Sequence, residues 1–240
     1  MMKSRKIKQY RSRNRGFTLI EIAIALLIIG LILGGGLSVL SAQVEMQKTR
    51  DTNRVLEEAK EALMGFAVVN GRLPRPATSA TNGVENIALC ATDLACTGLL
   101  PWATLGTTKL DGWNKVIRYS VSPAFANSNF ALATPATKIV LTRSSIGAIQ
   151  PLANPVPAVV FSHGKSNFGT TDAGAAIPNA SAGNTDEINN NTGSGPGITF
   201  TQRTSVENPP AGLGGSFDDI VIWLPPGILF NRMVQASRLP

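Results

Sequence analysis

The 240-residue chain has few of the side chains that carry most enzyme chemistry, with one histidine and two cysteines. Cys90, Cys96 and the distant His163 do not supply the ligand spacing of a zinc site. No nucleophile motif includes His163, which we expect at the surface end of a strand. Basic and aromatic residues are not interleaved anywhere, which argues against binding of nucleic acid. The composition therefore favours a structural protein over an enzyme.

Acidic residues are absent from the first 16 positions, which hold seven bases: Lys3, Arg5, Lys6, Lys8, Arg11, Arg13 and Arg15. Subtracting these seven from the 22 bases of the chain leaves 15 bases against 15 acids in the other 224 residues. The net charge of +7 therefore lies in this one block. A basic block directly before an apolar segment is typical of a cytoplasmic leader.

Charge is also absent from residues 22–44, a run of 23 positions. As a helix, this run is long enough to cross a bilayer of roughly 30 Å. It is longer than the core of a secretory signal, and its only cleavage-like feature, residues 15–17, precedes it. We expect a leader at 1–16, a single membrane span at 17–44, and a globular domain at 45–240 that is periplasmic or extracellular.

Glu21 is the only charged residue between Arg15 and Glu45. A carboxylate at this depth is costly, so it indicates a function, and its partner should be named. A cut after Gly16 would create such a partner, the new amine of Phe17. A plain, uncleaved signal anchor explains the basic block and the apolar run but gives no reason for Glu21.

Helical periodicity continues beyond the apolar run, which predicts one helix from residue 17 to about residue 70. Its second half has a predicted apolar face made of Val55, Ala59, Ala62, Leu63, Phe66 and Val69. Gly71 and the prolines after it end the pattern. The cluster Gly34–Gly36 interrupts it, since each glycine costs about 1 kcal/mol of helix stability relative to alanine.

Strand patterns fill most of the remaining chain. They lie at 115–122, 130–132, 138–143, 158–162, 198–202 and 219–223. Their hairpin-scale spacing predicts an α+β fold, in which an antiparallel sheet packs on the apolar face of the long helix. We expect residues 179–197 to form a mobile loop that buries little, and residues 226–239 to contain a short helix.

Cys90 and Cys96 have five residues between them, in a segment of loop-like composition. The expected topology puts both outside the cytoplasm, where thiols oxidise. We therefore predict a disulfide bond that closes a small loop.

The segment Arg-Gly-Phe-Thr-Leu-Ile-Glu at 15–21 resembles the leader and processing site of type IV pilins and of the pseudopilins of type II secretion systems. Gly-Arg-Leu-Pro at 71–74 is similar to the Gly-x-Tyr/Leu-Pro that ends the long pseudopilin helix. Residues 111–119 are similar to the Asp-Pro-Trp-Gly…Tyr-x-Tyr segment of major pseudopilins, with Gly112 in place of the proline and Asn114 in place of the glycine.

The resemblance implies cleavage between Gly16 and Phe17 by a prepilin peptidase, followed by methylation of the Phe17 amine. It implies a type IV pilin-like fold and assembly with other pilin or pseudopilin subunits at an inner-membrane assembly platform. In the filament, at the cell surface or in the periplasm, Glu21 would face the amine of a neighbouring subunit, and an unpaired carboxylate would be penalised.

The resemblance to major pseudopilins also implies a calcium site, for which Ser162, Asp172 and Asp218 offer oxygen ligands. We expect no other cofactor. The function that the sequence favours is a minor pilin or pseudopilin, a structural subunit of a type IV pilus-like fimbrium or a type II secretion filament. The alternative is a signal-anchored periplasmic binding module that does not polymerise.

Overall fold

The computed structural model describes residues 16–179, 183–192, 198–207, 209–210 and 212–239. Side chains at 33–39 and 192 are outside this description, but the backbone at Gly34–Gly36, where the sequence predicted an interruption, is helical. The chain divides into two units, residues 1–45 and 46–240, which are described separately. Among the described residues, no helix is both long enough and apolar enough to cross a membrane.

One helix, α1 (Leu19–Asn70), contributes to both units and confirms the predicted long helix. It ends where the sequence indicated. Gly71 has a left-handed backbone with φ of 75°, and its N–H donates to the carbonyl oxygen of Ala67 at 2.8 Å. Glycine takes this conformation without the steric penalty of a Cβ atom, which is why it often follows the last helical residue.

The buried face of α1 in the second unit differs from the predicted face by a small rotation. Leu63 and Ala59 are buried as expected, but Val69 is 67% exposed. The face that packs consists of Thr52, Val55, Leu56, Ala59, Leu63, Met64 and Ala67. These positions still recur every three or four residues, so the period was predicted correctly and its phase was not.

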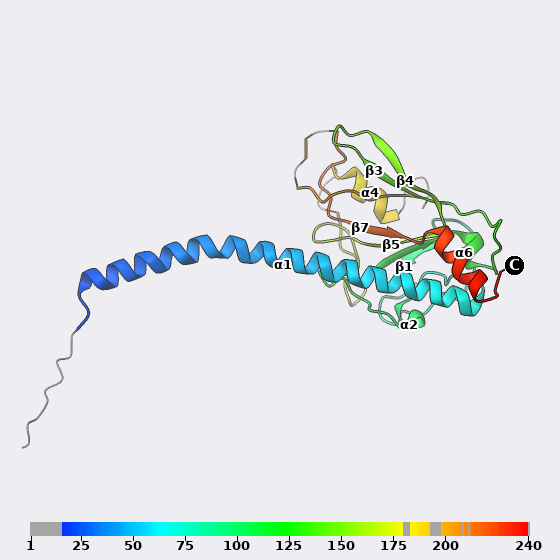
Figure 1. Cartoon of the computed structure of the whole chain (residues 1–240), viewed down its shortest axis with the longest axis horizontal. Helices are drawn as coiled ribbons and strands as arrows, with labels where there is room; N and C mark the ends of the chain where they lie inside the picture. Colours follow the sequence, from blue (N-terminus) through cyan, green and yellow to red (C-terminus); the bar gives the residue numbers. More distant parts are fainter. Residues whose placement is uncertain (1–15, 180–182, 193–197, 208, 211, 240) are drawn as a thin grey trace, which may run out of the picture. The chain divides into compact units, whose positions relative to one another are not determined.

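A four-stranded antiparallel sheet packs against this face, in the order β1-β2-β5-β7. Its strands are β1 (Thr97–Leu99), β2 (Arg118–Val121), β5 (Ala158–Ser162) and β7 (Ile220–Trp223). In Figure 1 the helix α6 (Pro226–Gln235) lies beside the end of α1, and its Leu229 and Met233 join the same core. The α+β class is therefore confirmed.

A second, three-stranded sheet covers the other face of the first, in the order β4-β3-β6. It consists of β3 (Lys138–Arg143), β4 (Ile149–Val156) and β6 (Thr199–Thr201), and its β3–β6 pair is parallel. The central strand β5 is buried on both faces: Ala158 and Val160 contact the helix side, while Val159 and Phe161 contact the second sheet. Because both faces of this strand are buried, its sequence is a nearly continuous run of apolar residues.

Several predicted strands require correction. Residues 130–132 form no strand, and the partners of β2 are β1 and β5. No strand was predicted at β4, because its Asn154–Pro155 pair is typical of a turn. The pair lies inside β4, which is an edge strand and therefore tolerates proline. β1 was missed because three residues are too short to show alternation.

The segment 179–197, predicted as a mobile loop, contains the helix α4 (Thr185–Thr192). Its buried side chains are polar: Asp186, Glu187 and Asn190. A search for apolar periodicity does not detect such a helix. Two further single-turn helices are α2 (Trp102–Leu105) and α3 (Pro123–Ala126).

Cys90 and Cys96 form a disulfide bond, as the sequence predicted. Both are buried in the core shared with α1 and the first sheet. The bond therefore ties the connection after α1 to the centre of the second unit.

Candidate functional site

The first candidate site is the peptide bond between Gly16 and Phe17, in the first unit. This bond precedes α1, which begins at Leu19, so helical hydrogen bonds do not protect it. Phe17 is 84% exposed, and a Cβ atom on Gly16 would meet nothing within 4 Å. The bond is thus open to a protease in the isolated chain.

Thr18 and Glu21 form a capping box at the start of α1. The Thr18 N–H and Oγ1–H donate to Glu21 Oε2 at 2.8 and 2.9 Å, and the Glu21 N–H donates to Thr18 Oγ1 at 3.3 Å. These reciprocal bonds satisfy backbone donors that a helix start leaves without partners. The Thr-x-x-Glu spacing could have indicated this role from the sequence. Helix capping is a function of Glu21 that requires no second subunit.

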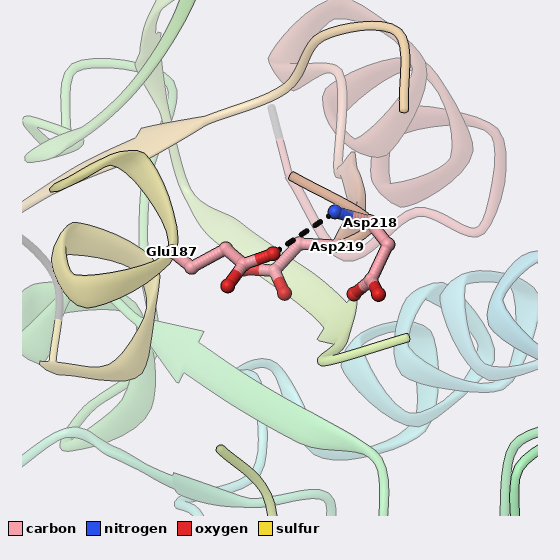
Figure 2. A group of neighbouring side chains, drawn as sticks. All are labelled: Glu187, Asp218 and Asp219. Atoms are coloured by element: carbon pink, nitrogen blue, oxygen red, sulfur yellow. Dashed lines mark hydrogen bonds between the residues drawn. The ribbon is translucent and has the colours of Figure 1, made fainter. Parts of the chain in front are cut away.

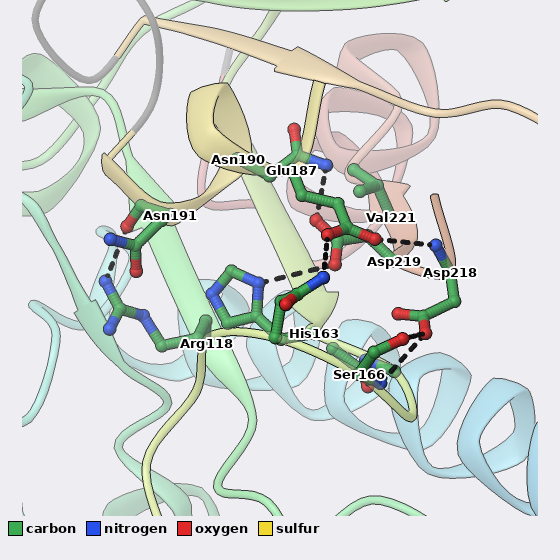
Figure 3. Close-up of polar contacts among 12 residues, drawn as sticks. Arg118, His163, Ser166, Glu187, Asn190, Asn191, Asp218, Asp219 and Val221 are labelled. Atoms are coloured by element: carbon green, nitrogen blue, oxygen red, sulfur yellow. Dashed lines mark hydrogen bonds and ion pairs between the residues drawn. The ribbon is translucent and has the colours of Figure 1, made fainter. Parts of the chain in front are cut away.

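The second candidate site lies at one end of β5 and β7, in the second unit. Ser162 of β5 pairs with Ile220 of β7, so the antiparallel register brings the next residues, His163 and Asp219, together. His163 Nδ1 lies 3.4 Å from Asp219 Oδ1, and both side chains are 1% exposed. The expectation that His163 is a surface residue is therefore wrong, because α4 and the loop after β5 cover this strand end (Figure 3).

Glu187 of α4 and Asp218, before β7, complete this cluster with Asp219 (Figure 2). One carboxylate oxygen from each lies within 4.8 Å of the others. The Asp218 N–H donates to Glu187 Oε1 at 3.1 Å, and Asn167 Nδ2 donates to Glu187 Oε2 at 2.8 Å. Asn190 Nδ2 donates to Asp219 Oδ2 at 2.8 Å. We call Glu187, Asp218 and Asp219 the acidic cluster.

The loop after β5 reaches the acidic cluster through Gly164 and Ser166. Gly164 has φ of 53°, and a Cβ atom there would lie 2.3 Å from the Asp218 carbonyl oxygen. Only glycine permits so close an approach with this backbone conformation. The Ser166 N–H then donates to Asp218 Oδ2 at 2.8 Å, and the Ser166 hydroxyl donates to the same atom.

Burial dominates the electrostatics of the acidic cluster. It raises the pKa of Glu187 and of Asp218, because a charged carboxylate loses hydration there. Lys115 contributes a positive charge, and its ammonium donates to the carbonyl oxygens of Ser166 and Asn167, both at 2.8 Å. Burial in turn lowers the pKa of Lys115. Three carboxylates near one ammonium leave an excess of acid, so the cluster could hold a cation.

The three predicted calcium ligands contact different partners and do not form one group. Asp218 belongs to the acidic cluster, but Asp172 forms an exposed ion pair with Lys109, and Ser162 Oγ donates to Asp111 Oδ2 at 2.6 Å. The described structure groups Asp218 with Glu187 and Asp219 instead. Sequence reasoning missed Glu187 because its helix lacks apolar periodicity. It missed the His163–Asp219 pair because the register of β5 and β7 brings them together from 56 positions apart.

Residues 11–37 match the model of the prokaryotic N-terminal methylation motif. Comparison with curated proteins and with solved structures gives no match. The motif implies processing by prepilin peptidase and assembly with pilin-like subunits, and it fits a membrane-anchored precursor. Through this segment the chain carries the signature of the precursors of type IV pilins and pseudopilins.

Proposed function

We propose that the protein is a structural subunit, a minor pilin or a pseudopilin, of a type IV pilus-like or type II secretion filament. Prepilin peptidase removes residues 1–16 and methylates the Phe17 amine. The apolar half of α1 holds the precursor in the inner membrane, with the domain from residue 45 onward in the periplasm. The subunit then enters a filament through an inner-membrane assembly platform.

The observation that carries this proposal is the methylation motif at residues 11–37, with Gly16, Phe17 and Glu21 in its pattern. The geometry at the start of α1 supports it. The Gly16–Phe17 bond lies outside the helix, and the helix begins two residues after the cleavage point. Cleavage would therefore release a chain that is helical almost from its first residue.

Glu21 contributes to assembly by pairing with the amine of a neighbouring subunit. In the single chain its carboxylate is exposed and accepts both of its described hydrogen bonds on Oε2. A carboxylate offers about four acceptor positions in total, so capacity for another donor remains. Within a low-dielectric bundle of apolar helices, this pairing would be much stronger than in water.

The size and the additional elements of the second unit support the role of a minor pilin, a subunit present in few copies. This unit combines the second half of α1 with two sheets, a loop closed by a disulfide bond and the helix α4. Such elaboration suits a subunit that acts in few copies, for example at a filament tip, because each insertion enlarges the volume that every neighbour must accommodate.

One observation favours a second candidate function, a signal-anchored periplasmic binding module that does not polymerise. The capping box with Thr18 explains Glu21 without any neighbouring subunit. In this alternative Glu21 starts the helix, and residues 1–16 stay attached. The two candidates therefore differ in whether the chain is cut.

The test is the intact mass of the protein purified from its native membrane, with and without prepilin peptidase. The proposal expects a species that begins at Phe17 and carries one additional methyl group, and the uncut chain when the peptidase is deleted. A matched variant, Gly16→Val, should stay uncut in both strains. An uncut wild-type chain in the presence of the peptidase would exclude the proposal and favour the anchored module.

A further inference from the structure

Lys115 brings a positive charge into the interior of the second unit. It precedes β2 and is 5% exposed. Its ammonium donates to three backbone carbonyl oxygens, those of His163 at 3.2 Å and of Ser166 and Asn167 at 2.8 Å each. An ammonium has three N–H donors, so these bonds use its full capacity. All three carbonyls belong to the loop after β5, which we define as residues 163–169.

We propose that the Lys115 ammonium is the resident cation of this loop and replaces a metal ion there, so that the domain is stable without calcium. The resemblance to major pseudopilins implies a calcium site, but the predicted ligands Ser162 and Asp172 do not join Asp218. The positive charge beside the loop comes from the protein's own sequence instead. This inference concerns the second unit and does not depend on the proposed function.

The oxygen atoms around the ammonium are of the kinds that calcium prefers. In proteins, calcium is bound by backbone carbonyl and carboxylate oxygens. Burial lowers the pKa of Lys115, and four nearby carboxylates oppose this effect: Asp218, Asp111, Asp219 and Glu187. A divalent ion that used the three carbonyls would have to displace the ammonium. Lysine and calcium are therefore alternatives at this position, and the chain contains the lysine.

The backbone of the loop requires a strong contact to hold it. Asn167 and Phe168 have φ of 41° and 39°. Residues other than glycine are strained in this left-handed region and persist there only where the surroundings fix them. Lys115 supplies such a contact, because its ammonium binds the carbonyl oxygen of Asn167 and that of Ser166 before it.

The position of the Lys115 side chain is fixed by its neighbours. Lys115 pairs with Thr171 in an antiparallel bridge. The Val116 N–H then donates to the Thr170 carbonyl oxygen at 2.8 Å. A Cβ atom on Gly169 would lie 2.9 Å from Lys115 Cδ, so the loop closes directly on the aliphatic part of the side chain. These contacts direct the ammonium toward the carbonyl oxygens of the loop.

The loop that Lys115 binds also holds the acidic cluster. The Ser166 N–H donates to Asp218 Oδ2 at 2.8 Å, and Figure 3 shows Ser166 directed toward this carboxylate. Asn167 Nδ2 donates to Glu187 Oε2 at 2.8 Å. Loss of the ammonium should therefore loosen the loop first, and then weaken the contacts that hold α4 and the residues before β7.

The test uses the full chain, purified in detergent, and Lys115→Met, which keeps the length of the side chain and removes the ammonium. The wild type should melt at the same temperature with saturating Ca²⁺ and with a chelator. Lys115→Met should melt lower by roughly 10 °C, because three carbonyls lose their donor. Its Gly164 and Ser166 amides should exchange hydrogen roughly tenfold faster than those of the wild type.

The matched control is Lys165→Met, which makes the same change in the same loop. The Lys165 side chain is 53% exposed, and its 3.7 Å ion pair with the exposed Glu207 contributes little. This variant should keep the melting temperature and the loop exchange of the wild type.

A higher melting temperature of the wild type in Ca²⁺ would overturn the inference. Equal melting and equal loop exchange of Lys115→Met and Lys165→Met would also overturn it, and so would a lower melting temperature of Lys115→Met without faster exchange in the loop. If Lys115→Met does not fold, the calcium titration of the wild type decides alone. An unchanged melting temperature then supports the internal cation, and a raised one excludes it.

Discussion

Gly112 donates its backbone N–H to Thr52 Oγ1 of α1 at 2.9 Å. A Cβ atom at residue 112 would lie 2.5 Å from the carbonyl oxygen of Lys48, so the loop touches the helix backbone directly. In the segment of major pseudopilins that this loop resembles, the same position is proline, which has no N–H to donate. The glycine is thus specific to the way this chain packs its loop on the helix.

The first prediction follows from that contact. Gly112→Ala should lower the free energy of unfolding by about 1–3 kcal/mol, because the methyl group overlaps rigid backbone. Thr52→Val should cost about 1 kcal/mol, because it removes the hydrogen bond that the half-buried Gly112 N–H donates to Thr52 Oγ1. Urea unfolding of the purified chain measures both. Gly227→Ala, where a Cβ atom meets nothing within 4 Å, is the control. Equal stability of Gly112→Ala and this control would contradict the contact.

The sequence predicted the long helix, its end at Gly71, the disulfide and most strands, because each depends on local patterns. It did not predict how the second sheet covers the first, since the parallel pairing of β3 with β6 joins residues about 60 positions apart. The site at His163 was missed for the same reason. Its members come from the end of β5, the start of β7 and a polar helix, and only the register and packing of these elements bring them together.

A second prediction concerns Tyr119, which is fully buried in the first sheet. Its hydroxyl has no hydrogen-bond partner among the described residues. Tyr119→Phe removes a desolvated polar group and should raise the free energy of unfolding by about 1 kcal/mol. Chemical unfolding at neutral pH measures this change. A loss of stability would indicate that the hydroxyl has a bonding role.

Tyr119 also predicts a pH dependence. Burial raises its pKa well above the usual value, so the folded protein keeps the phenolic proton after the unfolded chain has lost it. The folded state then binds more protons, and stability falls as pH rises beyond about 10. Tyr119→Phe should lose less stability than the wild type between neutral and strongly alkaline pH. Parallel curves for the two proteins would contradict this assignment.

The third prediction concerns the ion pair of Lys138 and Asp93. The Lys138 side chain is 0% exposed, and its Nζ lies 2.8 Å from Asp93 Oδ1. Burial lowers the pKa of Lys138, which shows that its charge is poorly hydrated. Asp93→Asn should therefore destabilise the fold by about 3–5 kcal/mol, because the buried ammonium loses its counter-charge.

The matched variant combines Asp93→Asn with Lys138→Met, which removes the buried charge and retains most of the side-chain volume. This double variant should recover most of the stability that the single substitution loses, since apolar replacements of buried pairs are often neutral or better. Urea unfolding of the four proteins in this cycle gives the coupling between the two residues. Independent, additive effects would show that the pair is not the reason for the loss.

The last prediction separates two roles of Glu21, helix capping and pairing with a neighbouring subunit. Glu21→Gln keeps an oxygen that can accept from the Thr18 N–H and hydroxyl but removes the negative charge. Thr18→Ala keeps the charge and removes the two bonds of the hydroxyl. If the carboxylate pairs with a neighbour's amine, Glu21→Gln should be cleaved and methylated normally yet stay out of filaments, while Thr18→Ala should assemble. If Glu21 acts only as a cap, Thr18→Ala should be impaired and Glu21→Gln should assemble. Immunoblots of the sheared filament and membrane fractions, together with intact mass to confirm processing, distinguish these outcomes.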